Sequence, residues 1–150
     1  MNITSSTPWL RRGREVELRD IVGLSRPVKI TSTSTAGEAL ISMIENKTDY
    51  LLIDRSGPND SYGIITRRDI VVGAVAEGRD LSSTTALEIA RKPLVVMNNL
   101  DLDLRWVAKK MANEGISKIA VFDKENFLGF ISDIDILKAV ATKAKKEAKA

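Results

Sequence analysis

The sequence of 150 residues contains neither cysteine nor histidine. Without them, a disulfide framework, the usual zinc sites and imidazole acid–base catalysis are excluded. Aromatic residues make up only 5%. No apolar run approaches the roughly 18 to 20 residues that a membrane-spanning helix needs. The first residues lack a basic segment followed by an apolar one, so we expect no signal peptide and a cytoplasmic protein with no membrane contact.

The residues that are present suit a globular protein, with 43% hydrophobic and 29% charged residues. The net charge of +3 is too small to predict nucleic-acid binding by itself. Trp9 is expected to pack on the folded body. Basic residues gather near both ends, where a solvated surface is the common outcome and phosphate contact is the alternative. They are Arg11, Arg12, Arg14, Lys143, Lys145, Lys146 and Lys149.

One stretch of the chain occurs twice. Residues 63–69 (GIITRRD) return as residues 129–135 (GFISDID), at an offset of 66 residues (135 − 69). Each copy predicts a short buried strand that runs directly into a helix. A hydroxyl stands at the junction, and a carboxylate follows three residues later. The protein is therefore expected to use one structural unit twice.

The surrounding pattern repeats as well, and each copy predicts the order β-α-β-β-α after a short lead-in turn. Thr35 and Glu38 form a predicted capping box, Asp103 is expected to cap the equivalent helix and Gly115 to end it. In the first copy the expected segments are a turn at 17–22, strands at 28–30, 50–53 and 63–65, a helix with core residues Ala39, Leu40, Met43 and Ile44, and a helix from 69 to about 76. In the second they are a turn at 87–90, strands at 94–96, 119–122 and 127–131, a helix with core residues Leu104, Val107, Ala108 and Met111, and a helix from 135 to about 144.

These elements predict a mixed α/β (α+β) fold. A single copy leaves one face of its sheet uncovered, so two copies are expected to cover each other. The predicted organisation is an N-terminal arm at 1–14, a first repeat at 15–78, a linker at 79–85, a second repeat at 86–142 and a basic C-terminal tail at 143–150.

The repeated junction has two interpretations. A hydroxyl followed three residues later by an acid caps a helix without any ligand. The same groups also suit a nucleotide: a helix N-terminus attracts phosphate, and a carboxylate can accept hydrogen bonds from ribose hydroxyls. The apolar strands at 28–30 and 94–96 could then hold a purine between them.

The whole pattern resembles a tandem pair of CBS domains (the cystathionine-β-synthase-type repeat), also called a Bateman module. The resemblance spans roughly residues 15–142. It is carried by Arg19–Val22, Pro27-Val28, Gly37–Leu40 with Met43, Ile53-Asp54 and Gly63–Asp69 in the first copy, and by Pro93–Val95, Val107-Ala108 with Met111, Gly115-Ile116, Val121–Asp123 and Gly129–Asp135 in the second.

This resemblance implies two repeats packed sheet against sheet about a pseudo-two-fold axis, usually in a flat homodimer. It also implies adenine-containing ligands (AMP, ADP, ATP or S-adenosylmethionine) in the clefts, and no required cofactor. Asp69 and Asp135 would hold the ribose, with Thr66 and Ser132 near phosphate. The implied nucleotide-binding residues are Val28, Ile30, Asp49, Tyr50, Thr66, Arg67, Arg68, Asp69, Leu94, Val96, Ser117, Lys118, Ser132, Asp133 and Asp135.

The charges at the two junctions differ. Arg67 and Arg68 lie between the hydroxyl and the acid of the first, whereas Asp133 lies there in the second. A carboxylate disfavours a phosphate nearby. We therefore expect the cleft of Asp69 to accept phosphates better than that of Asp135.

The favoured hypothesis is a stand-alone regulatory module, in which an adenine nucleotide shifts the conformation or the dimer arrangement and so signals to a protein partner. The alternative is a ligand-free interaction or dimerisation scaffold whose motifs serve only as caps. A third hypothesis is nucleic-acid binding through the basic ends. Catalysis is not expected, because the chain has no histidine, no cysteine and no Walker-type phosphate loop, and no metal site is predicted.

Overall fold

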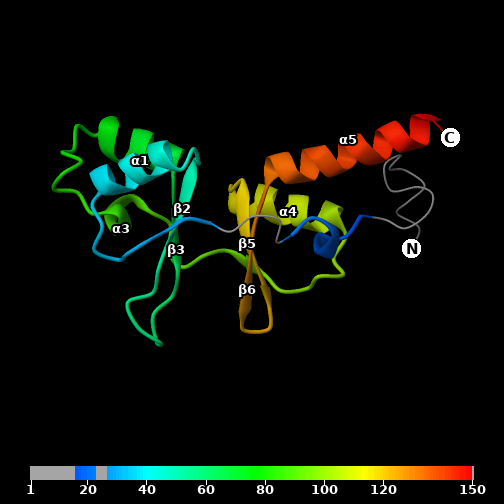
Figure 1. The fold of residues 1–150 in the computed structure, drawn as a ribbon, viewed down its shortest axis with the longest axis horizontal. Coiled ribbons are helices and arrows are strands. Elements are labelled where there is room, and N and C mark those ends of the chain that lie inside the picture. The colour runs from blue at the N-terminus through cyan, green and yellow to red at the C-terminus, as the bar shows by residue number, and fades with distance from the viewer. Residues whose placement is uncertain (1–15, 23–26, 150) are drawn as a thin grey trace. The chain divides into compact units, whose positions relative to one another are not determined.

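The computed structural model of the protein describes residues 16–22 and 27–149. The predicted N-terminal arm, with Trp9 and its arginines, and the side chain of Lys149 lie outside the described residues. The described chain forms two compact units, the central unit (residues 27–94) and the C-terminal unit (residues 95–149 with the segment 16–22). Each unit combines a three-stranded sheet with helices (Figure 1). The mixed α+β fold and the internal repeat are confirmed; the packing of one sheet on the other stays a prediction.

The central unit has its strands in the order β1-β2-β3. The first two strands are parallel and the last two antiparallel, with Tyr50 opposite Thr66 and Ile53 opposite Gly63. Its elements are β1 (Lys29–Ile30), α1 (Ala36–Glu45), β2 (Tyr50–Ile53), β3 (Gly63–Thr66), α2 (Arg67–Ile70), the π-helical turn η4 (Val71–Val75) and α3 (Ala86–Ile89).

The C-terminal unit repeats this topology with the order β4-β5-β6. Again the first pair is parallel and the second antiparallel, with Lys118 opposite Ser132. Its elements are the short helix η3 (Leu18–Asp20), β4 (Val96–Met97), α4 (Leu104–Glu114), β5 (Lys118–Asp123), β6 (Asn126–Ser132) and α5 (Asp133–Lys149).

The predicted ends of the first long helix of each repeat, the capping box of Thr35 and Glu38, the Asp103 cap and the Gly115 end, are confirmed. Thr35 accepts a hydrogen bond from the backbone of Glu38 at 3.0 Å, and the Glu38 carboxylate accepts one from Thr35 N–H at 2.9 Å. Asp103 caps α4 through the backbone of Arg105, and Gly115 ends it at φ +64°. This left-handed conformation suits glycine, because a Cβ there would strain the backbone.

Each unit has its own core, centred on the helix positions that the periodicity predicts. Ala39 and Met43 are buried in the central unit, as Leu104, Val107 and Met111 are in the C-terminal unit. Two assignments were wrong, since Ile44 is 67% exposed and Ala108 is exposed. Each follows a buried residue directly, and one residue turns a helix by about 100°, which carries these two side chains off the buried face.

The two last helices of the repeats differ from their predicted extents. Both begin directly after the capping hydroxyl, at Arg67 and Asp133, rather than at the acid. The first changes to a π-helical turn at Val71–Val75. The second continues to Lys149, because alanine and lysine favour helix throughout the segment predicted as a tail.

The lead-in turns are exchanged between the repeats. Leu18 of the first lead-in is fully buried in the core of the C-terminal unit, with Leu104 and Val107. Ala86 of the second lead-in is fully buried in the core of the central unit. Each compact unit therefore contains the lead-in turn that precedes the other repeat in sequence. The predicted repeat boundaries stay a prediction.

Candidate ligand sites at the two strand-to-helix junctions

The first junction is held by a reciprocal pair of hydrogen bonds. The backbone N–H of Thr66 donates to Asp69 Oδ2 at 2.8 Å, and the N–H of Asp69 donates to the Thr66 hydroxyl at 3.2 Å. Both residues are half-buried. The arrangement satisfies two N–H groups at the helix start and fixes the carboxylate beside them.

The second junction has the same geometry with one addition. The N–H of Ser132 donates to Asp135 Oδ2 at 2.8 Å, and the N–H of Asp135 donates to the Ser132 hydroxyl at 3.3 Å. The Ser132 hydroxyl also donates to Asp135 Oδ2 at 3.0 Å. Among the described contacts the Thr66 hydroxyl only accepts, so its proton can be donated to a ligand more readily than that of Ser132.

Neighbouring residues attach each helix start to its sheet. The N–H of Arg67 donates to the carbonyl of Asp49 at 2.8 Å, and that of Asp133 donates to the carbonyl of Ser117 at 2.9 Å. The guanidinium of Arg67 lies 3.9 Å from the Asp49 carboxylate, with its side chain 75% exposed. Part of its positive charge is therefore balanced within the unit.

The structure gathers the predicted polar residues into two groups, one in each unit. Those of the first group are Asp49, Tyr50, Thr66, Arg67, Arg68 and Asp69, and those of the second are Ser117, Lys118, Ser132, Asp133 and Asp135. Of the predicted apolar residues, Ile30 and Val96 lie on β1 and β4, whereas Val28 and Leu94 precede these strands, which are shorter than predicted. Val28 and Ile30 are half-buried and pack against the central core, Leu94 is half-buried, and Val96 is 43% exposed. Their contact with a base stays a prediction.

A cavity of about 500 Å³ in the C-terminal unit was not anticipated from the sequence. It adjoins Asp135 and extends along α5. Its other wall is the first lead-in turn, in the segment 16–22. Its lining residues are Val16, Asp20, Ile21, Asp135, Lys138, Ala139, Thr142, Lys143 and Lys146. The i, i+4 spacing of Lys138, Thr142 and Lys146 was a usable signal, but the lysines from 143 onward were assigned to a tail.

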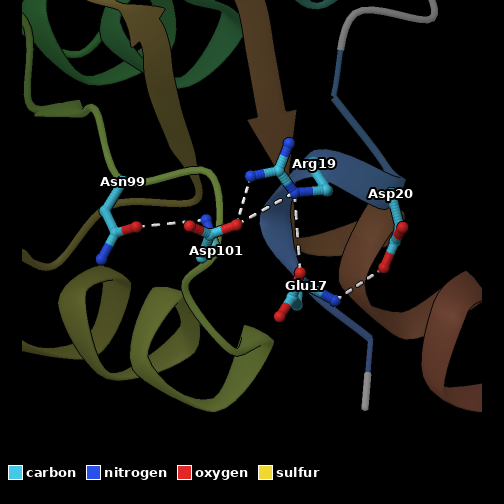
Figure 2. Close-up of polar contacts among 5 residues, drawn as sticks. All are labelled: Glu17, Arg19, Asp20, Asn99 and Asp101. Carbon is cyan, nitrogen blue, oxygen red and sulfur yellow. Dashed lines mark hydrogen bonds and ion pairs between the residues drawn. The ribbon is translucent and has the colours of Figure 1, made fainter. Parts of the chain in front are cut away.

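The wall formed by the lead-in turn is held by polar contacts (Figure 2). Arg19 Nε donates to Asp101 Oδ1 at 3.1 Å and lies 3.6 Å from Glu17 Oε1. The same hydrogen bond from Arg19 to Asp101 raises the pKa of Arg19 above its ordinary value. Asp20 accepts a hydrogen bond from the N–H of Glu17 at 2.9 Å. Backbone hydrogen bonds from Leu18 to the carbonyl of Leu102 and from Arg19 to that of Leu100 complete the attachment.

Another ion pair lies in the central unit, away from the first junction. Lys92 Nζ lies 2.8 Å from Asp60 Oδ1 and ties the loop between β2 and β3 to the segment that follows α3. The hydrogen bond from Lys92, with further hydrogen bonds from Ser56, holds the pKa of Asp60 far below its ordinary value of 3.8.

Neither a metal-binding cluster nor a membrane-spanning helix is found within residues 16–22 and 27–149. No three acidic side chains there are placed to hold a metal ion. None of the helices in that part of the chain is long and apolar enough to cross a bilayer.

The sequence model of the CBS domain matches residues 18–74 and 86–142, which contain the two junctions. The chain therefore belongs to the CBS domain family, with two CBS domains in tandem. Such a CBS pair is a regulatory module.

The chain is similar to three particular relatives. The hexameric CBS-CP12 protein from bloom-forming cyanobacteria is 31% identical, with a TM-score of 0.76 over 85% of this chain and 73% of that chain. The CBS domain pair of protein MJ0100, solved with 5′-methylthioadenosine and S-adenosyl-L-methionine, is 26% identical, with a TM-score of 0.70 over 86% of this chain and 98% of that chain. The uncharacterized protein MK0525 of Methanopyrus kandleri is 27% identical over 124 residues, which are 82% of this chain and 59% of that protein. The chain thus spans about six-tenths of this curated relative.

Proposed function

We propose that the protein is a regulatory sensor that binds an adenine-containing ligand at its strand-to-helix junctions. The observation that carries the proposal is the matched geometry of Thr66 with Asp69 and of Ser132 with Asp135, each at a helix start beside the edge of a sheet. The complexes of the MJ0100 pair with two adenosine derivatives support the same ligand class.

The junction groups have complementary tasks in this proposal. Each capping bond uses Oδ2 of the acid, so the Oδ1 atoms of Asp69 and Asp135 can accept hydrogen bonds from ribose hydroxyls. The Thr66 hydroxyl can donate to a phosphate oxygen, and the exposed Arg68 adds positive charge at the first junction. Asp133 adds negative charge at the second. We therefore assign phosphate at a helix start to the first junction.

Regulation would follow from unequal affinity for two conformations. A ligand that binds one arrangement of the protein more tightly shifts the population toward it. The regulated partner and a cytoplasmic location belong to this proposal as expectations. A ligand with equal affinity for both arrangements would transmit nothing.

The test is isothermal titration of the protein with AMP, ATP and S-adenosylmethionine. Asp69→Asn and Asp135→Asn keep an oxygen that accepts the capping bond and remove the charge. Hydrogen bonds to charged groups contribute about 1.5–3 kcal/mol, so we expect one variant to lose roughly 10- to 150-fold in affinity. Glu38→Gln makes a similar change in the capping box of α1 and alters no residue of either junction, so it is the control and should bind normally.

Two results would contradict the sensor. If none of the three ligands gives heat with the unaltered protein, the junctions are helix caps and the scaffold hypothesis replaces it. If a ligand binds but both asparagine variants bind it equally well, the ribose contact is assigned wrongly.

A homodimer is the accompanying proposal, and exposed apolar side chains support it. Both units carry them on equivalent helices, and a second copy of the chain would offer the same surfaces for mutual burial. They are Ile41, Ile44, Val71, Val72 and Val75 in the central unit and Trp106, Ile134 and Leu137 in the C-terminal unit. Light scattering should give twice the chain mass, and Ile44→Glu with Leu137→Glu should reduce it. A monomeric mass for the unaltered protein would contradict the dimer.

A further inference from the structure

The cavity beside α5 has a mixed lining that suits a ligand with both polar and apolar parts. Its volume of about 500 Å³ falls within the range of about 300–1,000 Å³ that is common for small-molecule sites. Val16, Ile21 and Ala139 supply apolar surface. Asp20 and Asp135 supply carboxylates, which accept hydrogen bonds from hydroxyl groups.

Three lysines give one wall of the cavity its charge. Lys138, Lys143 and Lys146 all lie on the face of α5 that also carries Asp135 and Thr142. At 1.5 Å per residue, the distance along the helix from Asp135 to Lys146 is about 16 Å. Ammonium groups at these positions can reach a chain of phosphates that extends away from Asp135. Phosphate there would avoid the helix start, where Asp133 disfavours it.

The first repeat has no counterpart of this lysine face. The residues 66 positions earlier than Lys138, Lys143 and Lys146 are Val72, Glu77 and Asp80. The offset is the one that relates Asp135 to Asp69. The lysines at these three positions are therefore specific to the second repeat.

The equivalent space in the central unit is also closed. A Cβ built on Gly73 would lie 3.0 Å from Cβ and Cγ2 of Ile89, so the lead-in helix α3 packs directly on this glycine. The ion pair of Arg79 with Glu88, at 2.6 Å, joins the same two segments. The position equivalent to Gly73 is Ala139 (139 − 66), whose methyl group lines the cavity instead.

We propose that the cavity between the lead-in turn and α5 binds a phosphorylated small molecule, with phosphates on Lys138, Lys143 and Lys146 and hydroxyls on Asp20 and Asp135. A nucleoside polyphosphate has both kinds of group. The ligand would contact the lead-in turn (residues 16–22) and α5 together. Binding would therefore stabilise the packing of the lead-in turn on the C-terminal unit. The inference extends the proposed function, because Asp135 belongs to both sites, but its charge recognition does not require adenine.

The test is a titration with three probes: ATP, inorganic tripolyphosphate and adenosine. The altered protein is Lys138→Gln with Lys146→Gln, two exposed positions that line the cavity. The matched control is Lys109→Gln with Lys145→Gln, which makes the same change in net charge at exposed helix positions that do not line it. A single exposed ion pair contributes little, so the cavity variant removes two at once. We expect it to lose about fivefold or more of its affinity for ATP and tripolyphosphate, and we expect the control to lose less than twofold.

A second variant tests the cavity independently of charge. Thr142 lines the cavity and is exposed, so Thr142→Phe should fill space without disturbing the core. It should weaken ATP binding while the melting temperature stays near that of the unaltered protein.

The outcomes separate this inference from the proposed function. Tripolyphosphate binding that depends on the cavity lysines supports the cavity site even if adenosine does not bind. Equal ATP affinity in the cavity and control variants overturns it while leaving the adenine sensor intact. The absence of binding by both ATP and tripolyphosphate also overturns it.

Discussion

The exchange of the lead-in turns predicts where Leu18 contributes its stability. This side chain is 0% exposed and belongs to the core that contains Leu104 and Val107. Leu18→Ala removes three buried carbon atoms and leaves a cavity, which costs about 2–5 kcal/mol at sites of this kind. The backbone hydrogen bonds of residue 18 do not depend on its side chain, so we expect about 3 kcal/mol from lost packing.

The measurement is urea unfolding followed by circular dichroism. With a slope of about 2 kcal/mol per molar urea, the loss corresponds to a midpoint shift of about 1.5 M. Leu87→Ala is the matched control, since Leu87 occupies the other lead-in helix and is only half-buried. Its effect should be smaller.

Double-mutant cycles then identify the core to which Leu18 belongs. Residues in one packed cluster usually couple by about 0.5–3 kcal/mol, whereas independent sites add within about 0.5 kcal/mol. Leu18→Ala should couple with Val107→Ala and be additive with Met43→Ala, which alters the central core. Coupling with Met43 and additivity with Val107 would refute the exchanged arrangement.

Two smaller predictions concern a helix end and an ion pair. Gly115→Ala should lower the free energy of unfolding by about 1 kcal/mol, because alanine is strained at φ +64°. A clash is not the cause, since a Cβ there would meet no atom within 4 Å. Urea unfolding measures the loss, and an unchanged midpoint would contradict the strain. The lowered pKa of Asp60 means that its pairing with Lys92 stabilises the fold above the ordinary carboxyl pKa of 3.8, and that this stabilisation is lost as the pH falls below it. Lys92→Ala should therefore lower the melting temperature at pH 7 and have a smaller effect near pH 2, whereas an equal effect at both pH values would show that the ion pair is not responsible.

The caps and buried strands were predictable because they depend on neighbouring residues. Thr35 with Glu38, and Thr66 with Asp69, place an acceptor and an acid three residues apart, and this spacing suffices to satisfy the N–H groups of a helix start. The central strands were recognised from short apolar runs, and Tyr50–Ile53 matches its predicted bounds.

Errors arose where a residue's surroundings depend on a distant segment. Ile44 is apolar and lies next to the buried face of α1, yet no element of the central unit covers it. The lysines of α5 resemble a solvated tail in sequence, and only the lead-in turn opposite them creates a cavity.

The sequence by itself determined that one unit occurs twice, that each copy ends in a capped helix bearing an acid, and that the chain belongs among tandem CBS domains. These features depend on neighbouring residues or on a repeated spacing, so they can be predicted from the sequence. The tertiary structure decided that Leu18 packs in the unit of the second repeat, that Ile89 closes the space beside Gly73, and that a cavity remains beside Ala139. The physical reason is that packing of segments far apart in sequence depends on the volumes of facing side chains, which spacing along the chain does not report.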